Sequence, residues 1–217
     1  RWLEQAVQGD APFFLFLHSY DCHGPYTKPG LFGLQGSPGY DGAMLKSAHN
    51  PQTYTRIYGS AYFPEFPLER IENSKGEIVL KKGERTALPA WAQTDVPRVT
   101  LGPEDQAFLR GLYSTGVVYA DLWLGVLLDE LDRMGIADTT TLIVLSDHGE
   151  DTLNHGFMGH RIELHDATTQ VPLMVRLPKA QRKTGRVKDL AQLLDVAPTV
   201  LGLAGVAVPD SMEGLRL

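Results

Sequence analysis

Residues 142–149 read LIVLSDHG, an unbroken apolar run rich in β-branched residues that ends in an acid, a histidine and a glycine. Such a run predicts a strand buried on both faces, which is typical of a parallel sheet. Ligands of open α/β sheets bind at the carboxyl ends of the strands, so we expect chemistry at Asp147 and His148. A carboxylate and an imidazole on adjacent residues are suited to one divalent cation. A helix cap beside an exposed histidine is the alternative interpretation.

Two further apolar runs, 13–19 and 171–177, predict strands of the same buried type. Apolar residues recur every three or four positions in 103–134, between the first two runs, and in 188–204, after the last run. These patterns predict two amphipathic helices. Alternating strands and helices with apolar strands indicate an α/β fold, with a mainly parallel sheet flanked by helices.

The boundaries of these helices carry their own signals. Residues 103–105, PED, supply an N-terminal proline and two acids, and Gly135 follows the last periodic position, so the first helix is expected to begin and end there. Pro198 falls inside the second pattern and predicts either a kink or a new first turn.

Composition places the chain among ordinary globular proteins. Its 217 residues are enough for one domain or most of one. The 20 Lys and Arg against 26 Asp and Glu leave a net charge of -6 without runs, so no nucleic-acid partner is expected. The apolar segments are interrupted by acids or glycine, so we also expect no membrane span. Cys22 is the single cysteine, which excludes an intrachain disulfide.

Residues 27–100 lack strong periodicity and are rich in proline and glycine. They predict an irregular insertion, either a lid or a substrate-specificity element, with a short strand at 77–80 in a small hairpin.

Histidines gather after two of the expected strands. His18, Asp21 and His23 follow the first apolar run. Three more histidines come after His148 in a glycine-punctuated loop, namely His155, His160 and His165. Each histidine taken alone is more simply a hydrogen-bonded loop residue, but several at strand ends favour a site.

The chain also carries a family resemblance. PFFLFLHSYDCHGPY at 12–26, TLIVLSDHGE at 141–150, NHGFMGH at 154–160, VPLMVRLP at 171–178 and DLAQLLDVAPTVLGLAGV at 189–206 resemble successive blocks of the sulfatase family, in the alkaline phosphatase superfamily. A pattern Y-x5-Y-x-D-x-x-LG at 113–125 agrees with it. The resemblance implies an alkaline-phosphatase-like fold, here incomplete at the N-terminus, with residues 1–217 as a partial catalytic domain.

The resemblance also implies residue roles. Asp147 and His148 match the paired ligands of the catalytic metal, although many members have Asp-Asn there. His23 matches a histidine that binds the sulfate or helps protonate the leaving oxygen. His160 falls where many members carry lysine, and an imidazole there would serve as general acid or as a cationic group. His155 is expected to be structural, and His165 to be a packing residue or to lie at the rim of the site.

The cofactors implied by the family are a divalent metal and a formylglycine nucleophile. Calcium is the expected metal for a sulfatase, and Mn²⁺ or Zn²⁺ for a phosphoryl or phosphonyl hydrolase. The formylglycine motifs C-x-P-x-R and S-x-P-x-R are absent from the 217 residues. Cys22 lies in a different context and is a poor candidate nucleophile. We therefore expect the nucleophile and the remainder of the sulfatase domain outside this chain, which alone should be inactive.

The predicted function is therefore metal-dependent hydrolysis of a sulfuric ester on a small molecule or glycan. A phosphodiester or phosphonate monoester hydrolase of the same superfamily is the nearest alternative, favoured by Asp-His over Asp-Asn. A non-catalytic binding protein is the alternative from another class. The resemblance favours a periplasmic or extracellular location.

Overall fold

The computed structural model describes residues 2–9, 11–24, 26, 39–42, 45, 70–72, 78–80, 101–155, 158–160 and 164–217. The chain is divided into two compact units. The first comprises Arg1–Ala137 and His148–Gln170, and the second comprises Asp138–Asp147 and Val171–Leu217. Most of the expected insertion at 27–100 lies outside the described residues.

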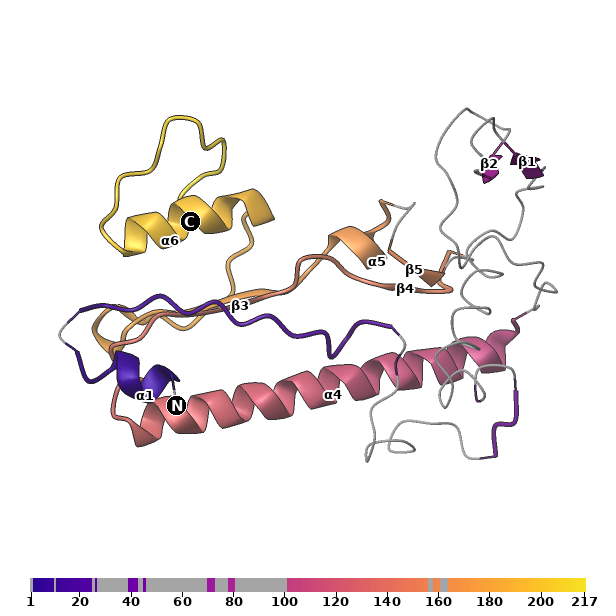
Figure 1. The fold of residues 1–217 in the computed structure, drawn as a ribbon, viewed down its shortest axis with the longest axis horizontal. Coiled ribbons are helices and arrows are strands. Elements are labelled where there is room, and N and C mark those ends of the chain that lie inside the picture. Colours follow the sequence, from indigo (N-terminus) through magenta and orange to yellow (C-terminus); the bar gives the residue numbers. More distant parts are fainter. Residues whose placement is uncertain are drawn as a thin grey trace. The chain divides into compact units, whose positions relative to one another are not determined.

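Helices and strands are distributed over both units (Figure 1). The first unit contains α1 (Trp2–Ala6), β1 (Arg70–Glu72), β2 (Ile78–Leu80), α4 (Pro103–Arg133), β4 (Asp151–Thr152), β5 (Met158–Gly159) and α5 (Asp166–Thr169). The second contains β3 (Leu142–Leu145), β6 (Leu173–Arg176), the 3₁₀ turns η2 (Lys179–Gln181) and η3 (Leu193–Asp195), and α6 (Val196–Leu203).

The long helix α4 begins and ends where the sequence predicts. The Asp105 carboxylate accepts the backbone N–H of Gly102 at 2.8 Å, which satisfies one of the donors left open at a helix start. At the other end Gly135 has a φ of +70°. The N–H of Ile136 reaches back to the carbonyl of Leu131 at 3.0 Å. This is a Schellman termination, which glycine permits because it has no Cβ.

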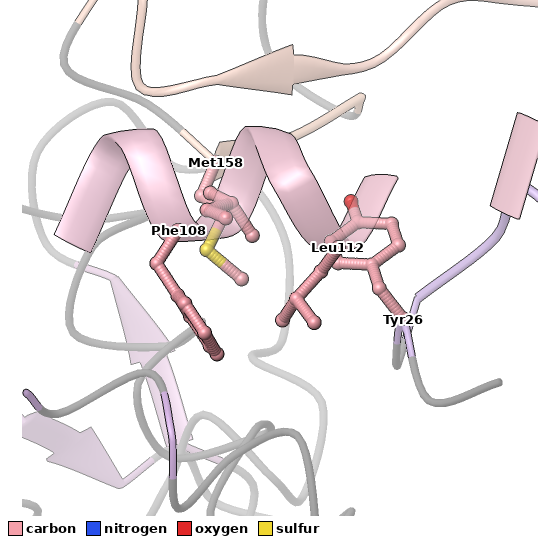
Figure 2. Packing of buried hydrophobic residues seen from close by; sticks show 5 residues of the cluster. Tyr26, Phe108, Leu112 and Met158 are labelled. Carbon is pink, nitrogen blue, oxygen red and sulfur yellow. The ribbon is translucent and has the colours of Figure 1, made fainter. Parts of the chain in front are cut away.

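The core of the first unit is one apolar cluster with contributions from three segments. Tyr26, Phe108, Leu109, Leu112 and Met158 are each at most 5% exposed. Figure 2 shows Tyr26 and Met158 approaching α4 beside Leu112 and Phe108. Burial of such side chains is worth about 1.5–3 kcal/mol each, so the cluster fixes the loop near residue 26 and the strand β5 against the start of α4.

A glycine lets the loop at 21–24 approach α4 closely. A Cβ placed on Gly116 would lie 2.5 Å from the carbonyl oxygen of Asp21, closer than real side chains allow. The expected apolar stripe of α4 thus includes a small residue for a steric reason, and the loop that carries His23 rests directly on the helix.

The start of α1 is tied to the end of α4. Arg133 forms ion pairs with Glu4 at 2.9 Å and with Glu130 at 2.7 Å. Trp2 packs edge-on against Phe13, with ring centroids 6.3 Å apart. The segment 13–19 is therefore held at its first residue, Phe13, by the contact with Trp2.

In the second unit, β3 and β6 pair antiparallel, with Leu142 opposite Arg176 and Leu145 opposite Leu173. The helix α6 begins at Val196, so Pro198 lies in its first turn and does not kink a longer helix. The buried Asp195 accepts the N–H groups of Gln192 and Leu215 at 2.8 and 2.7 Å, which binds the last residues to this turn.

Three strand predictions need correction. Residues 13–19 form no strand, and Phe14 and Phe16 are 70% and 74% exposed, because no described residue pairs with this segment. The strands within 142–149 and 171–177 do form, but they run antiparallel and are only partly covered, with Met174 55% exposed. An apolar run predicts burial and not direction, and these two strands make a sheet of two in the described chain.

The small hairpin is confirmed, since β1 and β2 pair antiparallel with Ile71 opposite Val79. All strand pairs among the described residues are antiparallel. The mainly parallel sheet of the whole domain therefore stays a prediction.

By length and composition, α4 would also suit a membrane, and it alone does so among the described helices. This is weak evidence, because the apolar core helix of a globular protein has the same character. The first half of α4 buries Phe108, Leu109 and Leu112 in the core of the unit, which accounts for part of its apolar character.

The close approach at Gly116 can be tested within one helix. We expect Gly116→Ala to lower the free energy of unfolding by about 1–3 kcal/mol, because the new methyl group must displace the Asp21 backbone. Gly125→Ala is the matched control. No atom lies within 4 Å of its added Cβ, so the helix should gain about 0.5–1 kcal/mol. Urea unfolding measures the free energy of unfolding of both variants. An equal increase in this free energy at both positions would contradict the close contact between Gly116 and Asp21.

Candidate active site

His148 follows the strand β3 in the sequence and is one of the two predicted metal ligands. Its Nδ1 lies 2.8 Å from the carbonyl oxygen of Gly149. Because a carbonyl only accepts, Nδ1 carries the hydrogen, and in the neutral ring Nε2 keeps its lone pair. Metal-binding histidines commonly make such a bond with their other nitrogen. Asp147 directly precedes His148, is exposed and belongs to the second unit, so a shared metal remains a prediction.

His160 follows β5 and stacks on His148. The two ring centroids are 3.8 Å apart with an interplanar angle of 24°. Its Nδ1 lies 2.9 Å from Oε1 of Glu150, and the two side chains are 17% and 6% exposed. A histidine that the sequence places twelve residues beyond His148 is therefore its direct neighbour, and it is paired with a buried carboxylate.

His23 completes the group from the other side. Its ring lies edge-on to His160, with centroids 5.5 Å apart. Its Nδ1 lies 2.6 Å from the carbonyl oxygen of Gly24, so this ring also directs hydrogen-bearing Nδ1 to the backbone. Three of the four predicted site residues thus converge within the first unit. Their chemical roles stay predictions.

Two residues of the site are not apparent from sequence spacing. Glu150 accepts a hydrogen bond from the Tyr26 hydroxyl at 2.7 Å through Oε2, while Oε1 faces His160. Tyr26 is 2% exposed and belongs to the apolar core. The one available signal was position, since Glu150 follows His148 by two residues and Tyr26 follows His23 by three.

Tyr113, on α4, borders this arrangement. Its ring lies edge-on to Tyr26 at 5.9 Å. Burial raises the pKa of the Tyr113 phenol above its ordinary value, and the nearby Cys22 and Glu150 raise it further. Each cause disfavours the phenolate, so the hydroxyl stays protonated. The Tyr113 side chain therefore borders the site as a neutral phenol.

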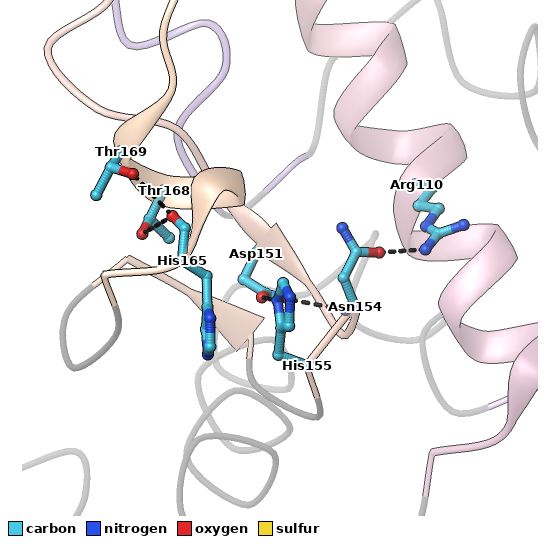
Figure 3. A network of polar contacts seen from close by, with 7 residues as sticks. All are labelled: Arg110, Asp151, Asn154, His155, His165, Thr168 and Thr169. Carbon is cyan, nitrogen blue, oxygen red and sulfur yellow. Dashed lines mark hydrogen bonds and ion pairs between the residues drawn. The ribbon is translucent and has the colours of Figure 1, made fainter.

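A second polar cluster holds the loop between β4 and β5 (Figure 3). The fully buried Asp151 accepts the N–H of Asn154 at 2.7 Å and lies 2.6 Å from Nδ1 of His155. His155 stacks on His165, with centroids 3.9 Å apart. Asn154 also contacts Arg110 of α4. These contacts agree with the structural role expected for His155 and with a packing role for His165.

A metal ion needs several ligands close together. Among the described residues, three or more His, Cys, Asp and Glu side chains never gather in a way that would hold an ion. The hydrogen bond of His148 leaves its ring in the form that binds metals. The imidazole of His148 thus suits a metal, and the metal site at Asp147 and His148 stays a prediction.

The family model described as Sulfatase matches residues 1–206. The match covers nearly the whole chain and agrees with the blocks that surround the three histidines. The chain belongs to the sulfatase family.

Three curated relatives are matched over different shares of their length. Arylsulfatase K of Xenopus laevis is 22% identical over 222 residues, which cover 100% of this chain and 37% of the relative. Iduronate 2-sulfatase of Mus musculus is 26% identical, covering 96% of this chain and 39% of the relative. N-acetylglucosamine-6-O-sulfatase of Bacteroides thetaiotaomicron is 32% identical over 112 residues, covering 52% and 20%. The chain thus spans between 20% and 39% of these proteins.

A solved structure described as a 2-O GAG sulfatase is also similar. It shares 24% sequence identity at a TM-score of 0.48, over 54% of this chain and 26% of that one.

The polar cluster around Asp151 yields a test of stability. Asp151→Ala removes the acceptor of the Asn154 N–H and of the His155 ring, so we expect unfolding to require about 1–3 kcal/mol less free energy. Asp121→Ala, at an exposed position of α4, should change stability by no more than about 0.5 kcal/mol. Thermal and urea unfolding measure both. Equal changes in the free energy of unfolding for the two substitutions would show that the Asp151 contacts do not stabilise the fold.

Proposed function

We propose that this chain supplies the histidine-bearing part of the active site of a sulfuric ester hydrolase. The observation that carries the proposal is the convergence of His23 and His148 on His160, which is itself paired with Glu150, in a chain of the sulfatase family. Imidazole groups can neutralise an anionic ester group and transfer protons at neutral pH, and both are needed when a sulfate ester is cleaved.

In this proposal His160 and His23 act on the substrate. The Nδ1 of each ring is directed to a protein acceptor, so Nε2 is the nitrogen left for the substrate. We assign His160 to stabilising charge on the transferred group and protonating the leaving oxygen. His23 binds the sulfate or assists with the leaving oxygen. Tyr113, whose raised pKa keeps it protonated, borders these groups as a neutral phenol.

Asp147 and His148 would hold a divalent metal, for which calcium is our proposal, with Mn²⁺ or Zn²⁺ in a phosphoryl or phosphonyl hydrolase. Such an ion would supply positive charge beside the transferred group. We assign the formylglycine nucleophile and the remaining metal ligands to sequence outside these 217 residues, as part of the rest of the sulfatase domain. The alkaline-phosphatase-like parallel sheet would be completed in the same way.

The names of two relatives support a proposal for the substrate class. They are named for sulfate at a defined position of a sugar, N-acetylglucosamine-6-O-sulfatase and iduronate 2-sulfatase. We therefore propose a sulfated glycan or a small sulfated sugar as substrate. Such a substrate agrees with a location in the periplasm or outside the cell, which we also propose.

Phosphodiester or phosphonate ester hydrolysis remains the second candidate because Asp147 is followed by histidine and not asparagine. A non-catalytic binding protein would need the same fold but no functional nucleophile. Product analysis separates all three: inorganic sulfate from a sulfate ester, a phosphate monoester or a free phosphonate from a phosphodiester or phosphonate monoester, or no product.

The test is sulfate release from sulfated monosaccharides by the protein at the length that its gene encodes. We expect His160→Gln to lower kcat by about 10²- to 10⁴-fold, the range typical of a lost general acid or charge-stabilising group. His165→Gln, in the neighbouring structural cluster, is the matched control and should retain most activity. Cleavage of a phosphodiester or phosphonate monoester supplied in a parallel assay, without sulfate release, would replace the proposal with the second candidate. Full activity of the His160→Gln variant would show that His160 has no role in catalysis.

A further inference from the structure

The carboxylate of Glu150 is divided between two donors on different segments. Oε1 lies 2.9 Å from Nδ1 of His160, and Oε2 accepts the Tyr26 hydroxyl at 2.7 Å. The Glu150 side chain is only 6% exposed. A carboxylate at this burial is costly unless both oxygens are satisfied, and here both are.

We propose that Glu150 is the positioning residue of His160, a role that rests on the sulfuric ester hydrolysis proposed above. Glu150 acts through His160 and does not touch the substrate. It fixes which nitrogen of the ring carries hydrogen toward the protein and which nitrogen is presented to the reacting group.

The chemistry of the contact supports this role. A carboxylate oxygen accepts, so Nδ1 of His160 bears hydrogen whether the ring is neutral or protonated. Nε2, on the other side of the imidazole, is then the nitrogen available to the substrate in both states. Stacking on His148 at 3.8 Å and the edge contact with His23 at 5.5 Å restrict the ring plane as well. Together these contacts define both tautomer and orientation.

Tyr26 links this arrangement to the core. Its ring is 2% exposed and packs in the apolar cluster, while its hydroxyl holds the second oxygen of Glu150. Rotation of the carboxylate away from His160 would break this second bond. The orientation of His160 is therefore supported by packing around α4, and not by one exposed contact.

The adjacent acid shows what Glu150 does differently. Glu150 and Asp151 follow each other, and each is paired with the Nδ1 of a histidine, His160 and His155 respectively. Only His160 also contacts His148 and His23, whereas His155 stacks on His165. The two acid–histidine pairs thus have the same chemistry in different places, and the second is an internal control for the first.

The tautomer of His160 is the direct test. Two-bond ¹H–¹⁵N correlation spectra of protein labelled at histidine, recorded at mildly alkaline pH, distinguish Nδ1–H from Nε2–H rings, and His160→Gln assigns the signal. We expect Nδ1–H in the wild-type protein and a shift to Nε2–H in Glu150→Ala. His155 should keep its Nδ1–H signal in both proteins. Tyr26→Phe should leave the tautomer unchanged, because Oε1 still accepts.

Glu150→Gln covers the case in which Glu150→Ala does not fold. It keeps the side-chain length but offers one acceptor oxygen to two donors, so we expect a mixture of the two tautomers. An unchanged Nδ1–H signal of His160 in either folded variant would overturn the proposal.

Kinetics provide a second readout on the protein at its encoded length. Glu150→Ala should lower kcat by about 10- to 100-fold, the usual effect of losing a partner that orients an active group, with little change in KM. A folded Glu150→Ala variant with wild-type kcat would contradict the role. Failure of the wild-type protein to release sulfate would defeat the proposed function, whereas the tautomer measurement would still report on Glu150.

Discussion

The arrangement of the first unit depends on the packing of five buried side chains around the start of α4. Tyr26, Met158 and the α4 residues Phe108, Leu109 and Leu112 come from three segments separated by up to 132 positions in the sequence. His23 lies three residues before the first of these anchors and His160 two residues after the second. The histidines meet because the core brings their neighbours together, so site geometry and unit stability have the same origin.

Two buried carboxylates, those of Glu150 and Asp151, hold the polar side chains next to this core. Glu150 connects Tyr26 of the core to His160, and Asp151 closes the turn that leads to His155. Buried acids of this kind contribute specificity only when their oxygens are satisfied, since an unpaired one would oppose folding. Here each oxygen has a donor, so His155 between β4 and β5 and His160 after β5 are held in defined positions.

Local signals predicted the parts of the fold that local chemistry controls. The limits of α4 follow from the Asp105 carboxylate and from Gly135, and Pro198 marks the first turn of α6. The prediction of a strand at 13–19 was wrong, because a strand requires a partner strand and an apolar run does not specify one. Likewise, the bond between Tyr26 and Glu150 joins residues 124 positions apart and is invisible to any spacing rule. Sequence blocks led us to predict His23, His148 and His160 as site residues, but not the pairing of His160 with Glu150.

A crystal structure of the protein grown with inorganic sulfate, the product of the proposed reaction, tests the central claim most directly. The account predicts that the rings of His23, His148 and His160 remain together and that a sulfate oxygen lies within hydrogen-bond distance, about 2.7–3.2 Å, of His160 Nε2. Nδ1 of His160 should still face Glu150. Separated histidine rings, or sulfate bound only away from them, would contradict the account.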